Sequence, residues 1–253
     1  MSAHPLPLAL AALRQKIAAL EGDHGPPQAV LPFDIPDLDR RLPGGGLATG
    51  ALHEVAGGGH GALDGAAAAR FAAGIAARLP GQVLWCVTEP DLFAPGLEQA
   101  GLPPDRVIYV EAGDDLSVLA CMEEGLRHGG LGAVVADVAK LSMTASRRLH
   151  LAAKGSGTLG IALRRVRYPV EATDFGQPTA AMTRWRVSML PSAPLPVPGV
   201  GRARWLVELI RARAGESLEI ELEACDGTGH LGLPADLADR SAAAAGGPHR
   251  AVG

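Results

Sequence analysis

The residues of this sequence that could do chemistry begin with a glycine-rich loop between an apolar and an alanine-rich segment. The loop consists of Gly57, Gly58, Gly59, His60, Gly61, Ala62, Leu63 and Asp64. A strand, a glycine turn and a helix, in that order, point backbone N–H groups at a phosphate in nucleotide-binding proteins. Phosphoryl transfer in the P-loop pattern G-x-x-x-x-G-K-[ST] also needs a lysine and a hydroxyl. Counted from Gly57, the last three positions are Ala62, Leu63 and Asp64, so both groups are missing.

Asp64 is a second obstacle to phosphate binding. A carboxylate in the first turn of a helix interacts favourably with the positive end of the helix dipole and repels a phosphate there. We therefore predict a degenerate Walker A loop, which keeps the strand–turn–helix shape as a scaffold but binds no nucleotide. The expectation is a protein that is not an enzyme, with no cofactor.

Two other chemistries fit the same region less well. Gly57 to Ala62 reads G-x-G-x-x-A, the fingerprint of a dinucleotide site, and Glu89 would be its ribose-binding acid. Glu89 lies 30 positions beyond Gly59, however, where about 20 is usual. His53 and Glu54 begin a HExxH zinc motif whose second histidine is replaced by Gly57. His53 and His60 alone are too few ligands, so no metal site is predicted.

The elements that position the loop alternate between strand and helix patterns. We expect apolar strands within 51–57, 82–90, 106–113, 131–141 and 158–166, and helices within 64–79, 91–100, 116–130 and 144–157. This alternation predicts an α/β fold with a mostly parallel central sheet covered by helices on both faces. Ligands of such folds bind at the carboxyl ends of the strands. The glycine loop, Glu89 and Asp137 all fall at those ends.

The chain divides into four predicted parts. Residues 1–30 hold an amphipathic helix at 6–21 and a linker, and residues 31–168 form the α/β core. Residues 169–239 are basic and rich in strand patterns, which predict antiparallel β-ribbons at the C-terminal side of the core. The last segment, 240–253, has little to bury and is predicted to be a disordered tail.

Composition places the protein among ordinary globular chains. Of the 253 residues 47% are hydrophobic and 20% are charged, and only nine are aromatic. The three cysteines are scattered, and no apolar run approaches the ~18 residues of a membrane span. We expect a cytoplasmic protein with no membrane partner.

The net charge of −4 hides an asymmetry. Residues 147–213 contain 12 Lys or Arg and three acids, whereas the remainder contains 11 basic and 24 acidic residues. This split favours an anionic partner for the second half of the chain, although arginine-rich strands that only solvate a surface would give the same counts.

The segment before the loop, "FDIPDLDRRLPGGGLATGALHEV", resembles the start of the RecA ATPase core. Leu38-Asp39, Leu42, Gly44 to Leu47 and Gly50 match that pattern. Four longer blocks are similar to the bacterial ImuA family, namely "GGGLATGALHEVAG", "VLWCVTEPDLFAPGLEQAGL", "MEEGLRHGGLGAVVADVAKLSMTASRRLHLAAK" and "TRWRV" continuing to "RWLVELIRARAG". The similarity runs from about residue 31 to 232. It implies a RecA-like fold, in which Glu89 takes the place of the water-activating glutamate and Asp137 that of the magnesium-linked aspartate. With the lysine lost, we interpret both as vestigial acids.

The resemblance also implies a function. ImuA proteins take part in SOS-induced translesion DNA synthesis and mutagenesis after DNA damage. Their partners are ImuB, a Y-family polymerase-like protein, and an error-prone DnaE-type polymerase. We therefore expect a non-catalytic adaptor that binds ImuB through its C-terminal region, with RecA and single-stranded or primer–template DNA as further expected contacts. A RecA-type ATPase with a degenerate loop and a dinucleotide-binding oxidoreductase are the alternatives.

Candidate contact residues follow from this expectation. Arginine pairs with phosphate and an adjacent indole can stack on a base, so the arginines predicted to contact DNA are Arg164, Arg165, Arg167, Arg184, Arg186, Arg202 and Arg204. The residues predicted to contact the partner are Trp185, Trp205, Arg211 and Arg213. Strand alternation leaves a second interpretation open, in which both tryptophans point into the core.

Overall fold

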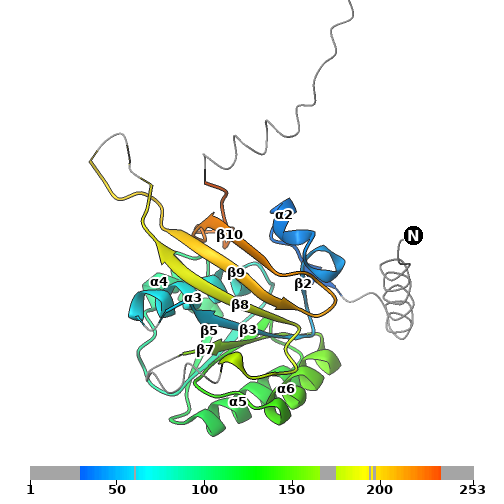
Figure 1. The fold of residues 1–253 in the computed structure, drawn as a ribbon. Helices are drawn as coiled ribbons and strands as arrows, with labels where there is room; N and C mark the ends of the chain where they lie inside the picture. The colour runs from blue at the N-terminus through cyan, green and yellow to red at the C-terminus, as the bar shows by residue number, and fades with distance from the viewer. Residues whose placement is uncertain (1–28, 60, 166–174, 194, 196–197, 235–253) are drawn as a thin grey trace, which may run out of the picture.

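The computed structural model describes residues 29–59, 61–165, 175–193, 195 and 198–234. The helix predicted at 6–21, His60, Arg167 and the predicted tail at 240–253 lie outside these residues. Within them the fold is an α/β fold built on one eight-stranded, mostly parallel sheet (Figure 1). The strand order is β10-β9-β8-β3-β7-β6-β4-β5.

The first five strands of this sheet along the chain lie within the predicted apolar segments, and the sheet contains eight strands in all. They are β3 (Leu52–Gly57), β4 (Val83–Val87), β5 (Val107–Glu111), β6 (Ala133–Val138), β7 (Leu159–Arg164), β8 (Thr183–Leu190), β9 (Arg204–Ala212) and β10 (Leu218–Glu223). Strands β3 to β7 pair in parallel, and each connection between them contains a helix, as right-handed crossovers require. The prediction of a mostly parallel sheet between helices is confirmed.

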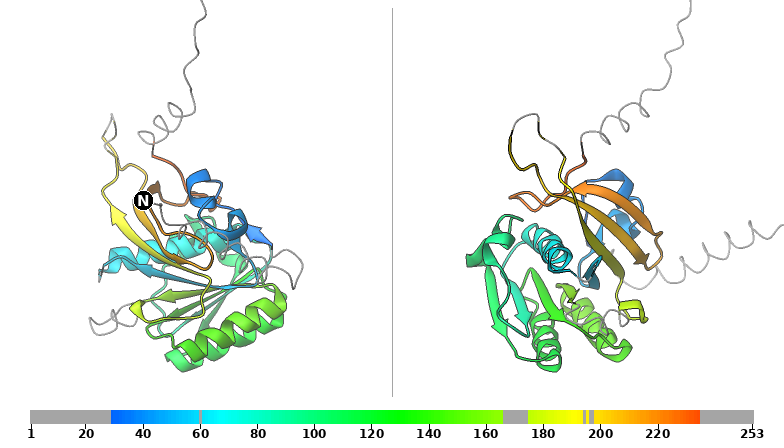
Figure 2. Two further views of the ribbon diagram at one scale, coloured as in Figure 1. Left: turned by 45° about the vertical axis from the view of Figure 1, so that its right-hand side comes forward. Right: turned by 60° about the vertical axis from the view of Figure 1, so that its left-hand side comes forward.

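Helices cover both faces of the sheet (Figure 2). Helix α3 (Ala62–Ala77) and the short α4 (Ala94–Glu98) pack on one face, while α5 (Asp115–His128) and α6 (Met143–Ser156) lie side by side on the other. Strand β4 shows why both faces need cover. Trp85 points into the cluster under α3, and its neighbour Cys86 points into the cluster under α5 and α6. Both side chains are fully buried, and this two-residue alternation gives the continuous apolar run seen in the sequence.

Local signals set the ends of the outer helices. Asp114 caps α5 by accepting hydrogen bonds from the backbone N–H groups of Leu116 and Ser117, and Ser142 caps α6 in the same way at Ala145. Both helices end at a glycine in the left-handed region, Gly129 and Gly157. Helix α3 differs, because its N-cap is Gly61 and no side chain caps it there.

The N-terminal part of the described chain packs beside the sheet. It contains α2 (Pro36–Asp39), the 3-10 turn η1 (Pro43–Gly45) and a two-stranded antiparallel ribbon of β1 (Val30–Leu31) with β2 (Leu47–Ala48). A second 3-10 turn, η2 (Pro104–Arg106), precedes β5. Phe33 from this part stacks on Phe71 of α3 and tilts against Trp185 of β8. The lead-in segment thus closes one end of the apolar core.

The C-terminal strands continue the main sheet. Strand β8 lies parallel to β3, and β9 and β10 then add antiparallel to it. The predicted antiparallel ribbon is therefore present, with β8 joined to the middle strand of the core. In the described part of the chain, no helix is long and apolar enough to cross a membrane.

Candidate functional site

The glycine loop forms the predicted strand–turn–helix where β3 leads into α3. Gly57 is required there because a Cβ on it would come within 2.8 Å of the backbone carbon of Asp64. A Cβ on Gly58 would likewise lie 1.7 Å from the hydroxyl oxygen of Ser188 on β8. Close approach to the backbone of α3 thus explains Gly57, and close approach to Ser188 explains Gly58.

Asp64 closes this loop from inside. One of its carboxylate oxygens accepts a hydrogen bond from the backbone N–H of Gly59 at 2.7 Å. The other oxygen accepts one from the backbone N–H of Met189, in β8, at 2.8 Å. The carboxylate therefore takes up a loop N–H group of the kind that a phosphate would need. Leu63, at the position of the P-loop lysine, is 72% exposed and has no charge.

One arginine, Arg165, pairs with two acidic residues of the same site. Asp137 is the next-to-last residue of β6 and is buried, and Asp91 follows β4. Nη1 of Arg165 lies 2.8 Å from a carboxylate oxygen of each, and Nη2 lies 2.5 Å from the second oxygen of Asp91. Burial acts to lower the pKa of Arg165, but Asp137 and Asp91 outweigh it and hold the pKa above its usual value. A fixed guanidinium thus stands between two carboxylates. Glu89, the other predicted acid, is exposed beyond β4.

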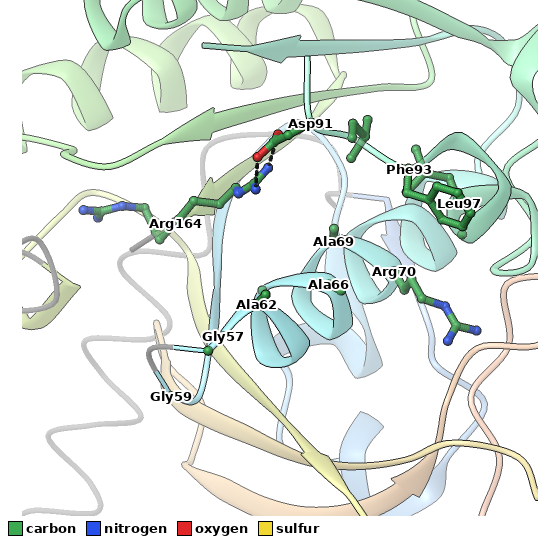
Figure 3. A pocket seen from close by; sticks show the side chains of 15 residues that line it. Gly57, Gly59, Ala62, Ala66, Ala69, Arg70, Asp91, Phe93, Leu97 and Arg164 are labelled. Carbon is green, nitrogen blue, oxygen red and sulfur yellow. Dashed lines mark hydrogen bonds and ion pairs between the residues drawn. The ribbon is translucent and has the colours of Figure 1, made fainter. Parts of the chain in front are cut away.

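A hollow of about 530 Å³ lies between the loop and α4 (Figure 3). Gly57 and Gly59 lie at the start of α3, and Ala62, Ala66 and Ala69 follow along the helix. Phe93 and Leu97 line the opposite side. Small and apolar side chains therefore form most of the walls. The charged lining residues are Arg70, Asp91, Arg164 and Arg165, of which Asp91 and Arg165 are paired with each other.

Deeper in the sheet, Glu54 of β3 holds two buried arginines. Its carboxylate oxygens lie 3.1 Å from a guanidinium nitrogen of Arg164 on β7 and 3.1 Å from one of Arg184 on β8. The hydroxyl of Thr179 donates to the same carboxylate, and both guanidinium groups lie over the ring of Phe175. Side-chain exposure is 0% for Glu54, 1% for Arg164 and 9% for Arg184. These three charges tie neighbouring strands together.

The predicted DNA contacts of Arg164 and Arg184 need correction for this reason. A side chain buried between strands and paired with Glu54 cannot reach a phosphate backbone. The other described arginines of that set also have carboxylate partners. Arg165 pairs with Asp91 and Asp137, Arg186 with Glu208, Arg202 with Glu223 and Arg204 with Glu221. Six of the seven predicted DNA-binding residues therefore have a carboxylate contact within the chain, and the seventh, Arg167, lies outside the described part.

The predicted partner contacts divide in a similar way. Trp185 and Trp205 are both 0% exposed and pack against Phe71, so the structure shows the inward orientation that strand alternation allowed and removes both indoles from any surface. Arg211 and Arg213, in contrast, are exposed. Among the described residues neither forms an ion pair, and Arg211 only donates to the carbonyl of Thr179 at 3.3 Å.

A second buried polar group sits beside Glu54. Nδ1 of His53 lies 2.7 Å from the hydroxyl of Thr183, and Nε2 lies 2.9 Å from the carbonyl oxygen of Ala48. Burial lowers the pKa of His53 to about 4, so the ring is neutral at neutral pH. Both ring nitrogens are thus in use, which excludes His53 as a metal ligand. No group of three or more potential metal ligands occurs in the part of the chain that the structure describes.

Comparison with known proteins gives this geometry its context. No family model matches the sequence. The chain is 40% identical over 233 residues to "Protein ImuA" of Caulobacter vibrioides (strain NA1000 / CB15N), which covers 87% of this chain and 94% of the relative. The chain belongs to the ImuA family. The same values hold for "Protein ImuA" of a second strain, ATCC 19089 / CIP 103742 / CB 15.

A solved structure supports the fold of this ImuA-family chain. The crystal structure of the RadB recombinase matches with a TM-score of 0.52 at 17% identity, and covers 76% of this chain and 94% of that one. At this identity the likeness concerns the fold. It agrees with the RecA-like fold that the resemblance of the lead-in segment implies.

Two residues of this site were not predicted from the ImuA-family sequence. The sequence indicates Glu54 as part of an incomplete zinc motif and as part of the strand in the RecA-like pattern, and it places Asp91 in a predicted helix. A signal for Glu54 did exist, because a lone carboxylate in an apolar strand needs a cationic partner. Arg164 and Arg184, at the ends of two other apolar strands, were the available partners.

Proposed function

We propose that this ImuA-family chain is a non-catalytic, RecA-like adaptor in an SOS-induced translesion synthesis complex, where it binds an ImuB-type polymerase-like protein. The observation that carries the non-catalytic part is the double hydrogen bond of Asp64 to Gly59 and Met189. A phosphate entering this loop would have to displace a carboxylate that already holds the N–H groups, and it would find no lysine to balance its charge.

The arginine between Asp91 and Asp137 supports the same proposal. A nucleotide-bound magnesium ion needs carboxylates that are free to face it. Here Arg165 supplies one positive charge to both acids through contacts of 2.5 to 2.8 Å. A divalent cation would have to expel this guanidinium first, because the two cations repel each other at such a distance.

Calorimetric titration of the full-length protein with Mg-ATP tests the non-catalytic part. We expect no saturable binding up to about 1 mM, the weak end of the range that enzymes use. Asp64→Ala frees the N–H group of Gly59 and removes the repulsion but supplies no cation, so it should still show no saturable binding in this range. Micromolar, magnesium-dependent binding by the unaltered protein would overturn the pseudo-ATPase proposal in favour of a RecA-type ATPase. The same titration with NAD tests the oxidoreductase alternative.

Partner binding requires a different test. Truncation before Thr183 would remove Trp185 and Trp205 from the core and so unfold the protein, which makes it unsuitable. Exposed residues of the predicted partner set are better targets. In a pull-down with ImuB, the double variant Arg211→Glu/Arg213→Glu should lose most of the capture, and Lys140→Glu, an exposed reversal on a different loop, should retain it. Equal capture by both would contradict the assignment of this surface.

The proposal assigns DNA contact chiefly to the polymerase partners. The six described arginines predicted for that role are engaged with carboxylates of the same chain. An arginine that already has a short carboxylate contact gains less from a phosphate than an unpaired one, because the new contact replaces the old. RecA and a DnaE-type polymerase are further proposed members of the complex.

A further inference from the structure

The outer face of α6 carries two positive charges that have no carboxylate partner among the described residues. Helix α6 contains Arg147, Arg148 and Lys154 and no acidic residue. Arg147 and Lys154 are exposed, and within the described residues neither has a carboxylate partner. They lie on one side of the helix with Leu151, since the spacings of four and three residues return to the same face.

Leu151 is an exposed apolar residue in the middle of this basic face. Its exposure is 65%, although the buried residues of α6 include Leu149 on the opposite side. Beside it lies a hollow of about 380 Å³, lined by Arg127, Arg148, Leu151, Ala152, Gly155 and Ser156. The small residues Ala152 and Gly155 leave the space, and the two arginines form its rim.

The rim arginines are held in place from below. Glu123 of α5 is buried, with its side chain 9% exposed, and its two carboxylate oxygens each contact one guanidinium, that of Arg127 at 2.6 Å and that of Arg148. The guanidinium-bearing side chains remain 61% and 65% exposed. Each guanidinium has five N–H donors, so donors are left over toward solvent. Because Glu123 already fixes both side chains, a ligand would lose less conformational entropy on binding them.

We propose that this α5–α6 face binds an acidic peptide segment of a partner protein, with one large apolar side chain in the hollow beside Leu151. Carboxylates of the segment would contact Arg147, Arg148 and Lys154. An apolar anchor in a pocket surrounded by polar contacts is the usual arrangement of a peptide-binding site. Nucleic acid explains the charges equally well, but it leaves the exposed leucine and the hollow without a role.

This inference rests on the proposed adaptor function and adds a binding face to it. The face lies on the side of the sheet opposite α3 and the glycine loop (Figure 2). The ATP titration and the ImuB pull-down involve neither Leu151 nor Lys154. Failure of one proposal can therefore be told apart from failure of the other.

Selection from a random peptide library tests the face directly. The full-length protein would be used to select displayed peptides of about 12 residues, enough to span this face. Selected peptides would then be measured by fluorescence anisotropy against Leu151→Glu and Lys154→Glu. Matched controls are Leu116→Glu, at an exposed leucine near the start of α5, and Lys140→Glu. All four positions are exposed, so melting temperatures should stay close to that of the unaltered protein.

The expected result is enrichment of Asp or Glu together with Leu, Ile, Phe or Trp. Leu151→Glu and Lys154→Glu should each weaken binding by about tenfold or more, and the controls should change it by less than about twofold. Absence of acidic enrichment, or equal affinity for Leu151→Glu, would overturn the proposal. So would a labelled single-stranded or duplex oligonucleotide whose binding needs Arg147 and Lys154 but tolerates Leu151→Ser, which removes the apolar side chain without adding a charge, since that result assigns the face to nucleic acid.

Discussion

The charged side chains at the carboxyl ends of the strands have partners within the chain, whereas two of those on the α5–α6 face have no carboxylate partner in the part that the structure describes. At the edge, Asp64, Glu54 and Arg165 all find partners within the chain, so the region that most resembles a nucleotide site is internally satisfied. On the α5–α6 face, Arg147 and Lys154 have no carboxylate partner among the described residues. Residues that look catalytic in sequence thus stabilise the fold, and residues of an ordinary helix are available for binding.

Among the variants that test this comparison, Glu54→Gln should change the free energy of unfolding most. Removing the carboxylate leaves Arg164 and Arg184 buried without a counter-charge, which should lower the free energy of unfolding by about 3–5 kcal/mol. Urea denaturation measures the change. The matched control is Glu221→Gln, which breaks the more exposed pair with Arg204 and should cost about 0–1 kcal/mol. Equal small losses in both variants would show that the buried network does not hold the strands together.

Protonation of His53 should change the free energy of unfolding by an amount between those of the other two tests. The folded-state pKa of His53 is about 4, below its unfolded value of 6.5, so the unfolded chain takes up a proton first as the pH falls. The stabilisation is complete above about pH 7 and is lost between about pH 6.5 and 4. Between about pH 7.5 and 5 the free energy of unfolding should fall by about 2 kcal/mol from this group. In His53→Gln that part of the slope should disappear, and an unchanged slope would contradict the assignment.

The smallest of these effects concerns the loop itself. Asp64→Ala removes the acceptor for the N–H groups of Gly59 and Met189 and should cost about 1–2 kcal/mol. Hydrogen exchange at these two amides should accelerate, while that at Trp185 in the same sheet should not. Asp64→Asn retains one acceptor oxygen and should lose about half as much. Unchanged exchange in Asp64→Ala would mean that the loop is held by glycine packing alone.

The sequence predicted the elements well because their signals are local. Val83 to Val87 reads as a strand from five neighbouring residues, and Gly129 or Gly157 marks a helix end by itself. The place of β8 was not predictable in this way. The alternation in "TRWRVSML" indicates a strand but not which strand it joins, and the structure pairs it in parallel with β3.

The site was harder to predict because its contacts join distant residues. Glu54 meets Arg164 across 110 positions and Arg184 across 130. An arginine next to a tryptophan, as in Arg184-Trp185, suggests base stacking. In a buried strand, however, the two side chains point to opposite faces of the sheet, so that the indole packs in the core and the guanidinium pairs with a carboxylate. The position of the pairing carboxylate in the folded chain decides between these two interpretations.

The central place of β3 also has a consequence for how the chain reaches its native state. Leu52 pairs with Gly160 and His53 with Thr183, so both neighbours of this strand are synthesised 108 and 130 positions after it. Such a high contact order predicts slow folding, with the apolar strand exposed while the ribosome completes the chain. Until Leu190 has emerged, β3 has an open edge, and the newly made protein should depend on chaperones during that interval.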